Sequence, residues 1–224
     1  MMTGSLLALQ PIVCGKARSH RAYEALARFP GPNGLRGPYE TLADGQWATL
    51  DREMIAHLRD WTLQGNRRLS PLFINLSAET LACDDNFDAW LEDFKGFQAD
   101  APAPVTLEVS EFVDDDLLDR RWPKLAALSH GIALDDFGAR YASLDRLKRY
   151  PWAICKFECA SLDAPATQEA MSFCRSHGIQ QVVERIESSS DAARASGVDL
   201  HQGYFYGRPQ AVAMDFSIRK VGVA

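Results

Sequence analysis

Two adjacent carboxylates, Asp135 and Asp136, come directly after the short apolar run 131–134 and are followed by Phe137 and Gly138. Neighbouring carboxylates repel each other and lose hydration when they are buried, so a fold that buries this run must supply positive charge beside them. Hard divalent cations are the usual source of that charge, because they prefer oxygen ligands. The alternative is a strand that ends in a solvated acidic turn, since Asp and Gly are ordinary turn residues.

The same pattern, an apolar run that ends in a polar side chain, recurs along the chain. Its members are Glu24, Asn75, Glu108, Asp135, Asp136, Lys156, Glu158, Glu184 and Gln202. An unpaired buried charge is costly, so packing does not explain this recurrence. Because the acids and amides offer oxygen, and no Cys or His belongs to the set, the pattern favours Mg²⁺ or Mn²⁺ over zinc. The charge of the set suggests two ions with a lysine beside them; the alternative is that each acid is a solvated strand terminus.

Two such ions roughly 3.5–4 Å apart are typical of phosphoryl hydrolysis. One ion lowers the pKa of a bridging water, and both neutralise charge as an oxygen is displaced in line. Lys156 would orient that water, or would accept its proton if the pKa of the lysine were depressed. The residue chemistry therefore predicts a two-metal phosphoesterase.

The elements that must position these residues alternate between strand and helix. Strands are expected at 6–13, 22–29, 72–77, 105–111, 131–134, 152–158, 180–187 and, as a last core segment, 201–209. Helices are expected at 47–63, 87–97, 117–128, through Leu144 and Leu147, at 166–176 and at about 191–195. Pro123 should kink its helix or mark a late start, the acidic run 114–116 reads as a helix start, and 30–38, with three prolines and three glycines, reads as a loop.

This alternation predicts parallel βα units and an α/β fold. About eight strands in 224 residues fit a (β/α)8 TIM-like barrel as a single domain over 1–224, with its motifs at about 10–209. In such a barrel the carboxyl ends of the strands converge on one face, where the polar set would meet. A doubly wound open sheet is the alternative, although no glycine-rich phosphate loop is present.

Composition narrows the partners. A net charge of -6 disfavours binding to DNA or RNA polymers, which needs a basic surface. No apolar run approaches the roughly 20 residues that span a bilayer, and Met1–Leu9 lacks the basic start of a secretory signal, so no membrane attachment is expected. Five scattered cysteines argue against a disulfide framework and for a reducing cytoplasm. The cysteines and histidines show no zinc-ligand spacing.

Six short motifs, in order along nearly the whole chain, resemble those of the EAL family of bacterial cyclic di-GMP phosphodiesterases. They are Tyr23-Glu24-Ala25-Leu26-Ala27-Arg28, Ile74-Asn75-Leu76-Ser77, Leu107-Glu108-Val109-Ser110-Glu111, Asp135-Asp136-Phe137-Gly138, Glu184-Arg185-Ile186-Glu187 and Gln202-Gly203-Tyr204. The resemblance implies a barrel that hydrolyses one phosphodiester of cyclic di-GMP to linear pGpG with Mg²⁺ or Mn²⁺. It also implies a homodimer.

The resemblance also implies a role for each matching residue. By position, Glu24, Asn75, Glu108 and Asp135 would hold the first ion, while Asp135, Asp136 and, in the place of a family aspartate, Glu158 would serve the second. Lys156 would position or activate the attacking water, Glu184 would bind the metal–water cluster, Arg28 would contact a substrate phosphate and Gln202 would line the substrate pocket. Glu111 would brace the loop after Asp136, and Glu187 would support the site.

Three positions depart from the family pattern. Glu158 replaces an aspartate and is one methylene longer, while Arg140 and Arg185 each replace a glycine. If position 140 requires positive φ, an arginine there strains the loop. These departures leave two alternatives to an active enzyme: a catalytically impaired receptor for cyclic di-GMP, or an EAL-like domain that only binds another protein.

Overall fold

The structure, a computed structural model, describes residues 4–64, 70–100, 104–128 and 130–212. Its strands are β1 (Leu6–Cys14), β2 (His20–Gly31), β3 (Gly34–Arg36), β4 (Leu72–Leu76), β5 (Val105–Val109), β6 (Gly131–Leu134), β7 (Ile154–Glu158), β8 (Gln180–Glu184), β9 (Leu200–Gln202) and β10 (Gln210–Ala211). Its α-helices are α1 (Trp47–Leu63), α2 (Ala78–Ala82), α3 (Asp84–Asp100), α4 (Asp115–Ala126), α5 (Leu144–Arg149), α6 (Pro165–His177) and α7 (Ser189–Arg194).

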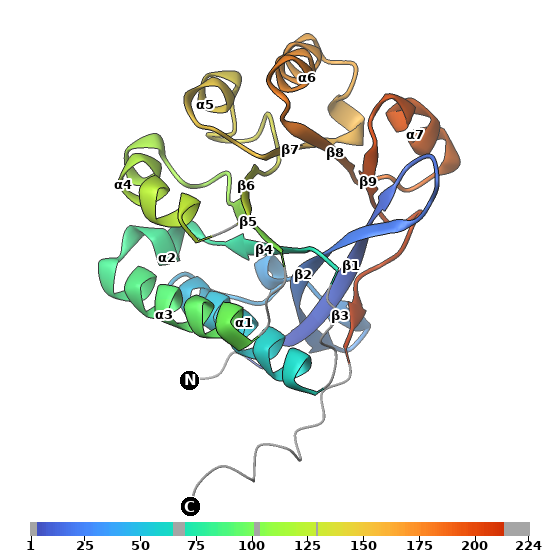
Figure 1. Ribbon diagram of the computed structural model, residues 1–224. Coiled ribbons are helices and arrows are strands. Elements are labelled where there is room, and N and C mark those ends of the chain that lie inside the picture. The colour runs from blue at the N-terminus through green and yellow to red at the C-terminus, as the bar shows by residue number, and fades with distance from the viewer. Residues whose placement is uncertain (1–3, 65–69, 101–103, 129, 213–224) are drawn as a thin grey trace, which may run out of the picture.

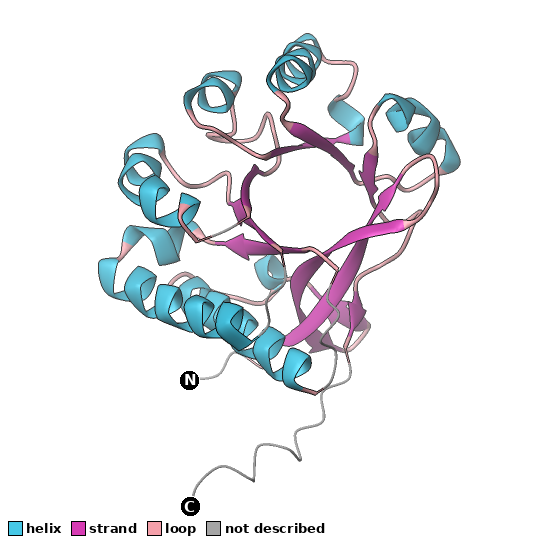
Figure 2. Ribbon diagram, viewed as in Figure 1, coloured by secondary structure: helices cyan, strands magenta, loops and turns pink. Residues whose placement is uncertain are grey.

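The sheet closes on itself. Around the ring the order is β1, β2, β4, β5, β6, β7, β8, β9 and back to β1, with helices outside (Figures 1 and 2). The expected eight-stranded (β/α)8-type barrel is therefore confirmed, and the open sheet is wrong. Short β3 and β10 extend the sheet beyond the ring by pairing with β2 and β1.

One barrel strand breaks the expected parallel pattern. β1 pairs antiparallel with both β2 and β9, whereas the other neighbouring pairs around the ring are parallel. The connection from Cys14 to His20 is too short for a parallel crossover, which needs a dozen or more residues, so β1 and β2 form a hairpin. As a result β1 presents its residues to the barrel in the reverse order.

The segment 30–38 is not the simple loop that its prolines and glycines predict. β2 continues to Gly31, and β3 turns back against it with Pro30 opposite Leu35. Pro32 and Asn33, both common turn residues, form the loop between the paired Gly31 and Gly34. Pro30 is tolerated because it lies beyond the part of β2 that pairs with β1, where β2 has a free edge. The hairpin leads to a single 3-10 turn at Pro38–Glu40.

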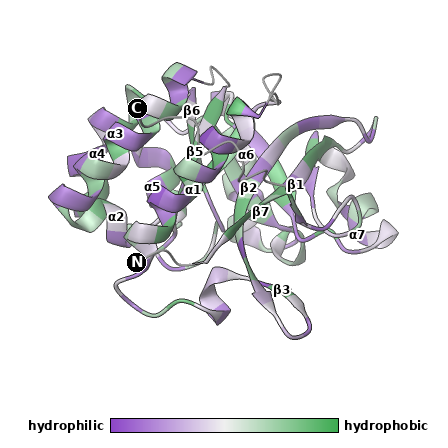
Figure 3. Cartoon of the chain, turned by 90° about the horizontal axis from the view of Figure 1, so that it is seen from below, coloured by the Kyte–Doolittle hydropathy of each residue, from purple (hydrophilic) through white to green (hydrophobic). Residues whose placement is uncertain are grey.

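The helices agree with their expected positions, with shifted ends and one addition. α1 has the expected bounds, and α4 begins at Asp115, where the side chain of Asp114 accepts a hydrogen bond from the Leu117 amide. Pro123 lies inside α4, so it does not mark a late start. Short α2 was not expected. In Figure 3 the helices carry both hydrophilic and hydrophobic residues, as helices that cover a barrel must. Among the described helices, none has the length and apolar character to cross a bilayer.

A buried carboxylate ties α1 to α2 behind the end of β4. Asp51 Oδ2 accepts hydrogen bonds from the Ser77 amide (2.9 Å), the Ser77 hydroxyl (2.6 Å) and the Thr80 hydroxyl (2.5 Å). Burial nevertheless outweighs these donors and raises the pKa of Asp51 from 3.8 to about 6. The folded chain therefore binds this proton more tightly than the unfolded chain between those two values.

We expect Asp51→Asn to reduce the pH dependence of stability. The contribution of Asp51 is fully present below its unfolded pKa of 3.8 and is lost as the pH rises through about 6, a change of about 3 kcal/mol. An asparagine oxygen in place of Oδ2 retains the three acceptor interactions and does not titrate. Urea unfolding should therefore show that the free energy of unfolding falls more from pH 4.5 to pH 7.5 in the wild type than in the variant. An equal fall in the two proteins would contradict the raised pKa of Asp51.

Candidate active site

The inside of the barrel is built in two layers. The lower layer is an apolar cluster with one residue from each of seven strands: Ile12, Ala22, Phe73, Ala133, Ile154, Val182 and Leu200. Because side chains on a strand alternate, the residue two positions further on faces the same side. In six of these strands that residue is polar, namely Glu24, Asn75, Asp135, Lys156, Glu184 and Gln202. The apolar layer thus closes the barrel beneath a ring of polar side chains.

Strand β1 supplies a residue that the sequence did not single out. Because β1 runs in the opposite direction, its polar residue lies two positions before Ile12, at Gln10, and Gln10 pairs with Glu24 in the register of the hairpin. Gln202 Nε2 donates to Gln10 Oε1 at 3.3 Å and to Glu24 Oε2 at 2.5 Å. The alternation of side chains along β1 places Gln10 and Ile12 on the same face. Only the antiparallel direction of β1 shows that Gln10, and not residue 14, belongs to the polar ring.

Lys156 lies at the centre of the polar ring and is 1% exposed. Its Nζ is 2.5 Å from Glu184 Oε1, 2.6 Å from Glu108 Oε1, 3.0 Å from Asp135 Oδ1 and 3.6 Å from Glu24 Oε2. These acids come from β2, β5, β8 and the end of β6, so the structure brings together residues that are far apart in the sequence. One ammonium group balances one of these four negative charges.

The excess of acid over base shows in the pKa values. Burial and the negative charge of Glu24 raise the pKa of Glu108 well above its ordinary value. Burial, which Lys156 only partly offsets, raises the pKa of Glu184 to about 8 and also raises that of Asp135. Burial acts the same way on Glu24, but Lys156 and the amide donors of Gln202 and Asn75 outweigh it and lower the pKa. The site therefore holds more acid than its own lysine can neutralise.

The surrounding acids hold the proton on Lys156. Burial lowers the pKa of this ammonium group, but the charges of Asp135, Glu108 and Glu184 outweigh it and raise the pKa well above its ordinary value. The sequence left two roles open for Lys156, orienting a water or accepting its proton. The second role requires a depressed pKa, so in the metal-free site these charges favour the first.

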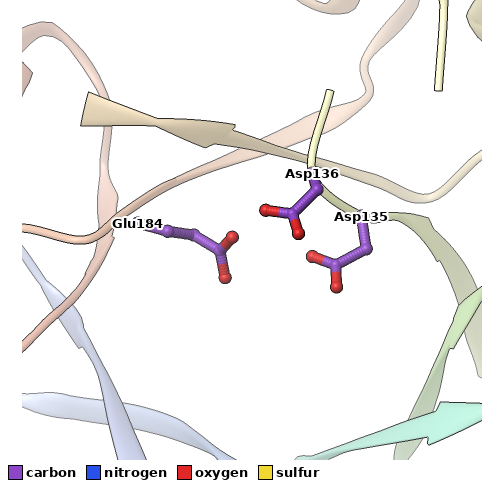
Figure 4. Close-up of side chains that lie close together, drawn as sticks. All are labelled: Asp135, Asp136 and Glu184. Atoms are coloured by element: carbon purple, nitrogen blue, oxygen red, sulfur yellow. The ribbon is translucent and has the colours of Figure 1, made fainter. Parts of the chain in front are cut away.

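The donor set fits a hard divalent cation. Asp135, Asp136 and Glu184 each offer one oxygen, and these oxygens lie within 4.8 Å of one another. Their carboxylates point toward a shared space from two sides (Figure 4). Glu108 Oε2 is buried and has no hydrogen-bond partner among the described residues, as expected of an atom that serves as a ligand. Asn75 Nδ2 donates to Glu24 Oε1 at 2.8 Å, which places Asn75 beside the same cluster.

A cavity of about 360 Å³ opens above this cluster. Its wall contains Arg28 and Tyr204 besides the acids, and Gln202 also lines it. Arg28 is half-buried, and its Nη1 donates to the Ala27 carbonyl at 2.8 Å, so the guanidinium is held at the wall with donors to spare. Tyr204 is 46% exposed. An anionic ligand with planar groups would find a cation, an aromatic ring and the acidic cluster within one cavity.

A family model for the EAL domain matches residues 4–209. The chain belongs to the EAL domain family. It is 33% identical over 205 residues to the cyclic di-GMP phosphodiesterase RocR of Pseudomonas aeruginosa, which covers 83% of this chain and 52% of RocR. The chain thus spans about half the length of that relative.

Two solved EAL structures share the fold. The YkuI protein of Bacillus subtilis, solved with cyclic di-GMP and calcium, has a TM-score of 0.77 at 22% identity and covers 96% of this chain and 57% of YkuI. Klebsiella pneumoniae BlrP1, solved with manganese and cyclic di-GMP, has a TM-score of 0.74 at 24% identity and covers 92% of this chain and 56% of BlrP1. At these identities the likeness establishes the fold.

Two predicted supporting residues of this EAL domain lie at the ends of strands near the cavity. The Glu111 carbonyl accepts a hydrogen bond from the Tyr141 amide at 3.2 Å, so the main chain at Glu111 contacts the loop that follows Asp136. The Glu187 amide donates to Asp191 Oδ2 at 3.1 Å, and Glu187 lines the cavity. The supporting roles expected of both residues stay predictions.

The loop after Asp136 is strained where the EAL family pattern has glycine. Arg140 has φ +45°, so this position does have positive φ and the strain expected of an arginine there is present. Its guanidinium lies 5.3 Å from the centre of the Phe112 ring, a contact that helps to hold the loop. Asp136 and Arg185 also have positive φ, at 45° and 55°. Such residues cost on the order of 1–3 kcal/mol each and cluster at functional sites.

Glu158, a predicted ligand of the second ion, lies at the outer edge of the site. It does not line the cavity, and its Oε1 lies 3.1 Å from Arg185 Nη2, with the Glu158 side chain 33% exposed. The two positions that depart from the EAL pattern at the ends of β7 and β8 thus form an ion pair with each other. From the sequence, Glu158 and Arg185 were two separate departures, because no sequence pattern connects residues 27 positions apart.

Proposed function

We propose that this EAL domain is a metal-dependent phosphodiesterase that hydrolyses cyclic di-GMP to linear pGpG. The supporting observation is the buried cluster of Glu24, Glu108, Asp135 and Glu184 around Lys156, at the bottom of a cavity walled by Arg28. A chain 33% identical is the cyclic di-GMP phosphodiesterase RocR, which makes this substrate the first to test.

The acids would hold Mg²⁺ or Mn²⁺, with two ions as the expected number at saturating metal. Glu24, Asn75, Glu108 and Asp135 would bind the first, and Asp135, Asp136 and Glu158 would serve the second. When bound, such ions lower the pKa of a water and neutralise charge on the phosphate. Oxygen-only ligation suits these ions rather than softer metals.

The chain's own side chains would position the reactants. Arg28 offers its guanidinium to a phosphate, since a planar fork of donors matches phosphate oxygens. Lys156 would orient the attacking water, and its Nζ lies 2.5 Å from Glu184 Oε1. Hydrolysis adds the water oxygen to phosphorus, breaks one P–O bond to the sugar, and transfers a proton to the departing oxygen. Gln202 would hold Glu24 in place through its amide nitrogen, which also donates to Gln10 Oε1.

The test is incubation of the chain with cyclic di-GMP and Mg²⁺ or Mn²⁺, with pGpG measured by liquid chromatography. We expect turnover that chelation abolishes and that Glu24→Ala reduces by roughly 10²–10³-fold or more. Glu24→Gln, which keeps the shape of the side chain, should lose activity to a similar extent and guards against a folding defect. Absence of turnover with both metals would overturn the proposal.

A second candidate function is binding of cyclic di-GMP without cleavage. The ion pair of Arg185 with Glu158 and the strain at Arg140 favour it, because both alter the outer part of the site. Calorimetry that shows tight binding of intact ligand, with no product after long incubation with metal, would select this function. The expected homodimer and cytoplasmic location stay predictions.

A further inference from the structure

Arg185 places a fixed positive charge at the outer edge of the acidic site. It follows Glu184 at the end of β8, and Glu184 lies opposite Glu158 in the register of β7 and β8. Its Nη2 lies 3.1 Å from Glu158 Oε1, and Arg185 lines the same cavity as Asp136 and Glu184. The backbone reaches this position only with φ +55°.

The acids of the site divide into two groups by their place relative to the two cations. The inner group, Glu24, Glu108, Asp135 and Glu184, surrounds Lys156. The outer group is Glu158, which forms the ion pair with Arg185, and Asp136, which lines the same cavity as Arg185.

The outer group contains the acids that, in the proposed function, only the second ion would use. We propose that Arg185 competes with the second divalent ion for Glu158, beside the cavity wall that it shares with Asp136, so that this chain binds one divalent ion tightly and a second only weakly. This inference rests on the proposed function for the identity of the two ion sites. Its own basis is the ion pair and the shared cavity.

The chemistry of the two cations explains why the competition is effective. A guanidinium group is weakly hydrated and matches a carboxylate with parallel donors, whereas Mg²⁺ gives up its waters reluctantly. A second ion would have to displace a charge that is already covalently tethered beside its ligands. Because the Arg185 side chain is 66% exposed, it can swing into solvent, so the second ion is weakened rather than excluded.

The test is a titration of the metal-free chain with Mn²⁺. Binding is measured by calorimetry and by electron paramagnetic resonance of the free ion. We expect one tight site in the wild type. Arg185→Gly, which removes the competing charge and the backbone strain together, should strengthen the second site by at least about tenfold. Arg185→Ala removes the charge and keeps a side chain at positive φ, so the same gain with alanine assigns the effect to charge.

Arg18→Gly is the matched control. Arg18 also has positive φ, at 50°, but does not line the cavity, so its replacement should leave both Mn²⁺ sites unchanged. Equal second-site affinity in the wild type and both Arg185 variants would overturn the inference, and so would two equally tight sites in the wild type. If these titrations fail while the wild type still hydrolyses cyclic di-GMP, only this inference falls. If the titrations succeed without hydrolysis, only the proposed activity falls.

Discussion

Glu108→Gln is expected to stabilise the metal-free chain and to abolish hydrolysis of cyclic di-GMP. Glu108 is 0% exposed, and burial together with the charge of Glu24 opposes its ionisation. A glutamine has the same shape without the charge, and three acids remain to pair with Lys156, so the free energy of unfolding should rise. The amide also removes a carboxylate from the proposed first ion, so kcat should fall by roughly 10²–10³-fold or more.

The measurements are urea unfolding in chelator at pH 8 and turnover in Mn²⁺. Glu169→Gln is the matched control, because Glu169 is an exposed acid whose partner, Lys148, lies 3.5 Å away on another helix. That variant should change neither quantity appreciably. A Glu108→Gln chain that is less stable than the wild type in chelator, or equally active in Mn²⁺, would contradict our description of the site as overcharged with acid.

Lys156→Met should have the opposite effect on stability. Methionine approximates the length of lysine and removes the only ammonium group that contacts the four inner acids within the described part of the chain. Breaking a buried charge pair by removing one partner costs about 3–5 kcal/mol. A divalent ion supplies positive charge to the same acids, so the stability loss should be larger in chelator than in Mn²⁺. Turnover should fall by about 10²–10⁴-fold, because the water loses its orienting group.

The control for this variant is Lys148→Met, which removes a lysine that is 45% exposed and pairs with Glu169. It should cost no more than about 1 kcal/mol, as surface ion pairs do. Unfolding is followed in urea with chelator and again with saturating Mn²⁺. If Lys156→Met loses the same stability under both conditions, the lysine and the ion do not share the same acids, and the proposed metal site is wrong.

Glu108→Gln and Lys156→Met both test whether the site holds more acid than its lysine can neutralise. The inner acids outnumber their lysine, and the structure tolerates this only through raised pKa values at Glu108 and Glu184 and through hydrogen bonds to Glu24. A site of this kind gives up stability in the metal-free protein in return for ligands that are ready for a cation. Removing an acid and removing the lysine must therefore move stability in opposite directions.

Much of the site was predictable from the sequence because it depends on local alternation. A strand residue and the residue two positions later face the same side, so an apolar residue followed by an acid in one strand after another places the acids in one layer. Glu24, Asp135 and Glu184 follow this rule, and Lys156 holds the same position in its strand. The choice of oxygen ligands and the barrel class were determined in the same way, from residue types and from the order of strands and helices.

The rest depended on which strands become neighbours and in which direction they run. Gln10 reaches the site because β1 runs antiparallel, Lys156 lies at the centre because closure of the ring brings β2 and β5 to within reach of β7, and Arg185 finds Glu158 because β7 and β8 pair in register. Such contacts join residues that are distant in the sequence. The sequence by itself therefore determined which residues could carry the chemistry, and the tertiary structure decided which charges meet, because an electrostatic interaction depends on separation in space.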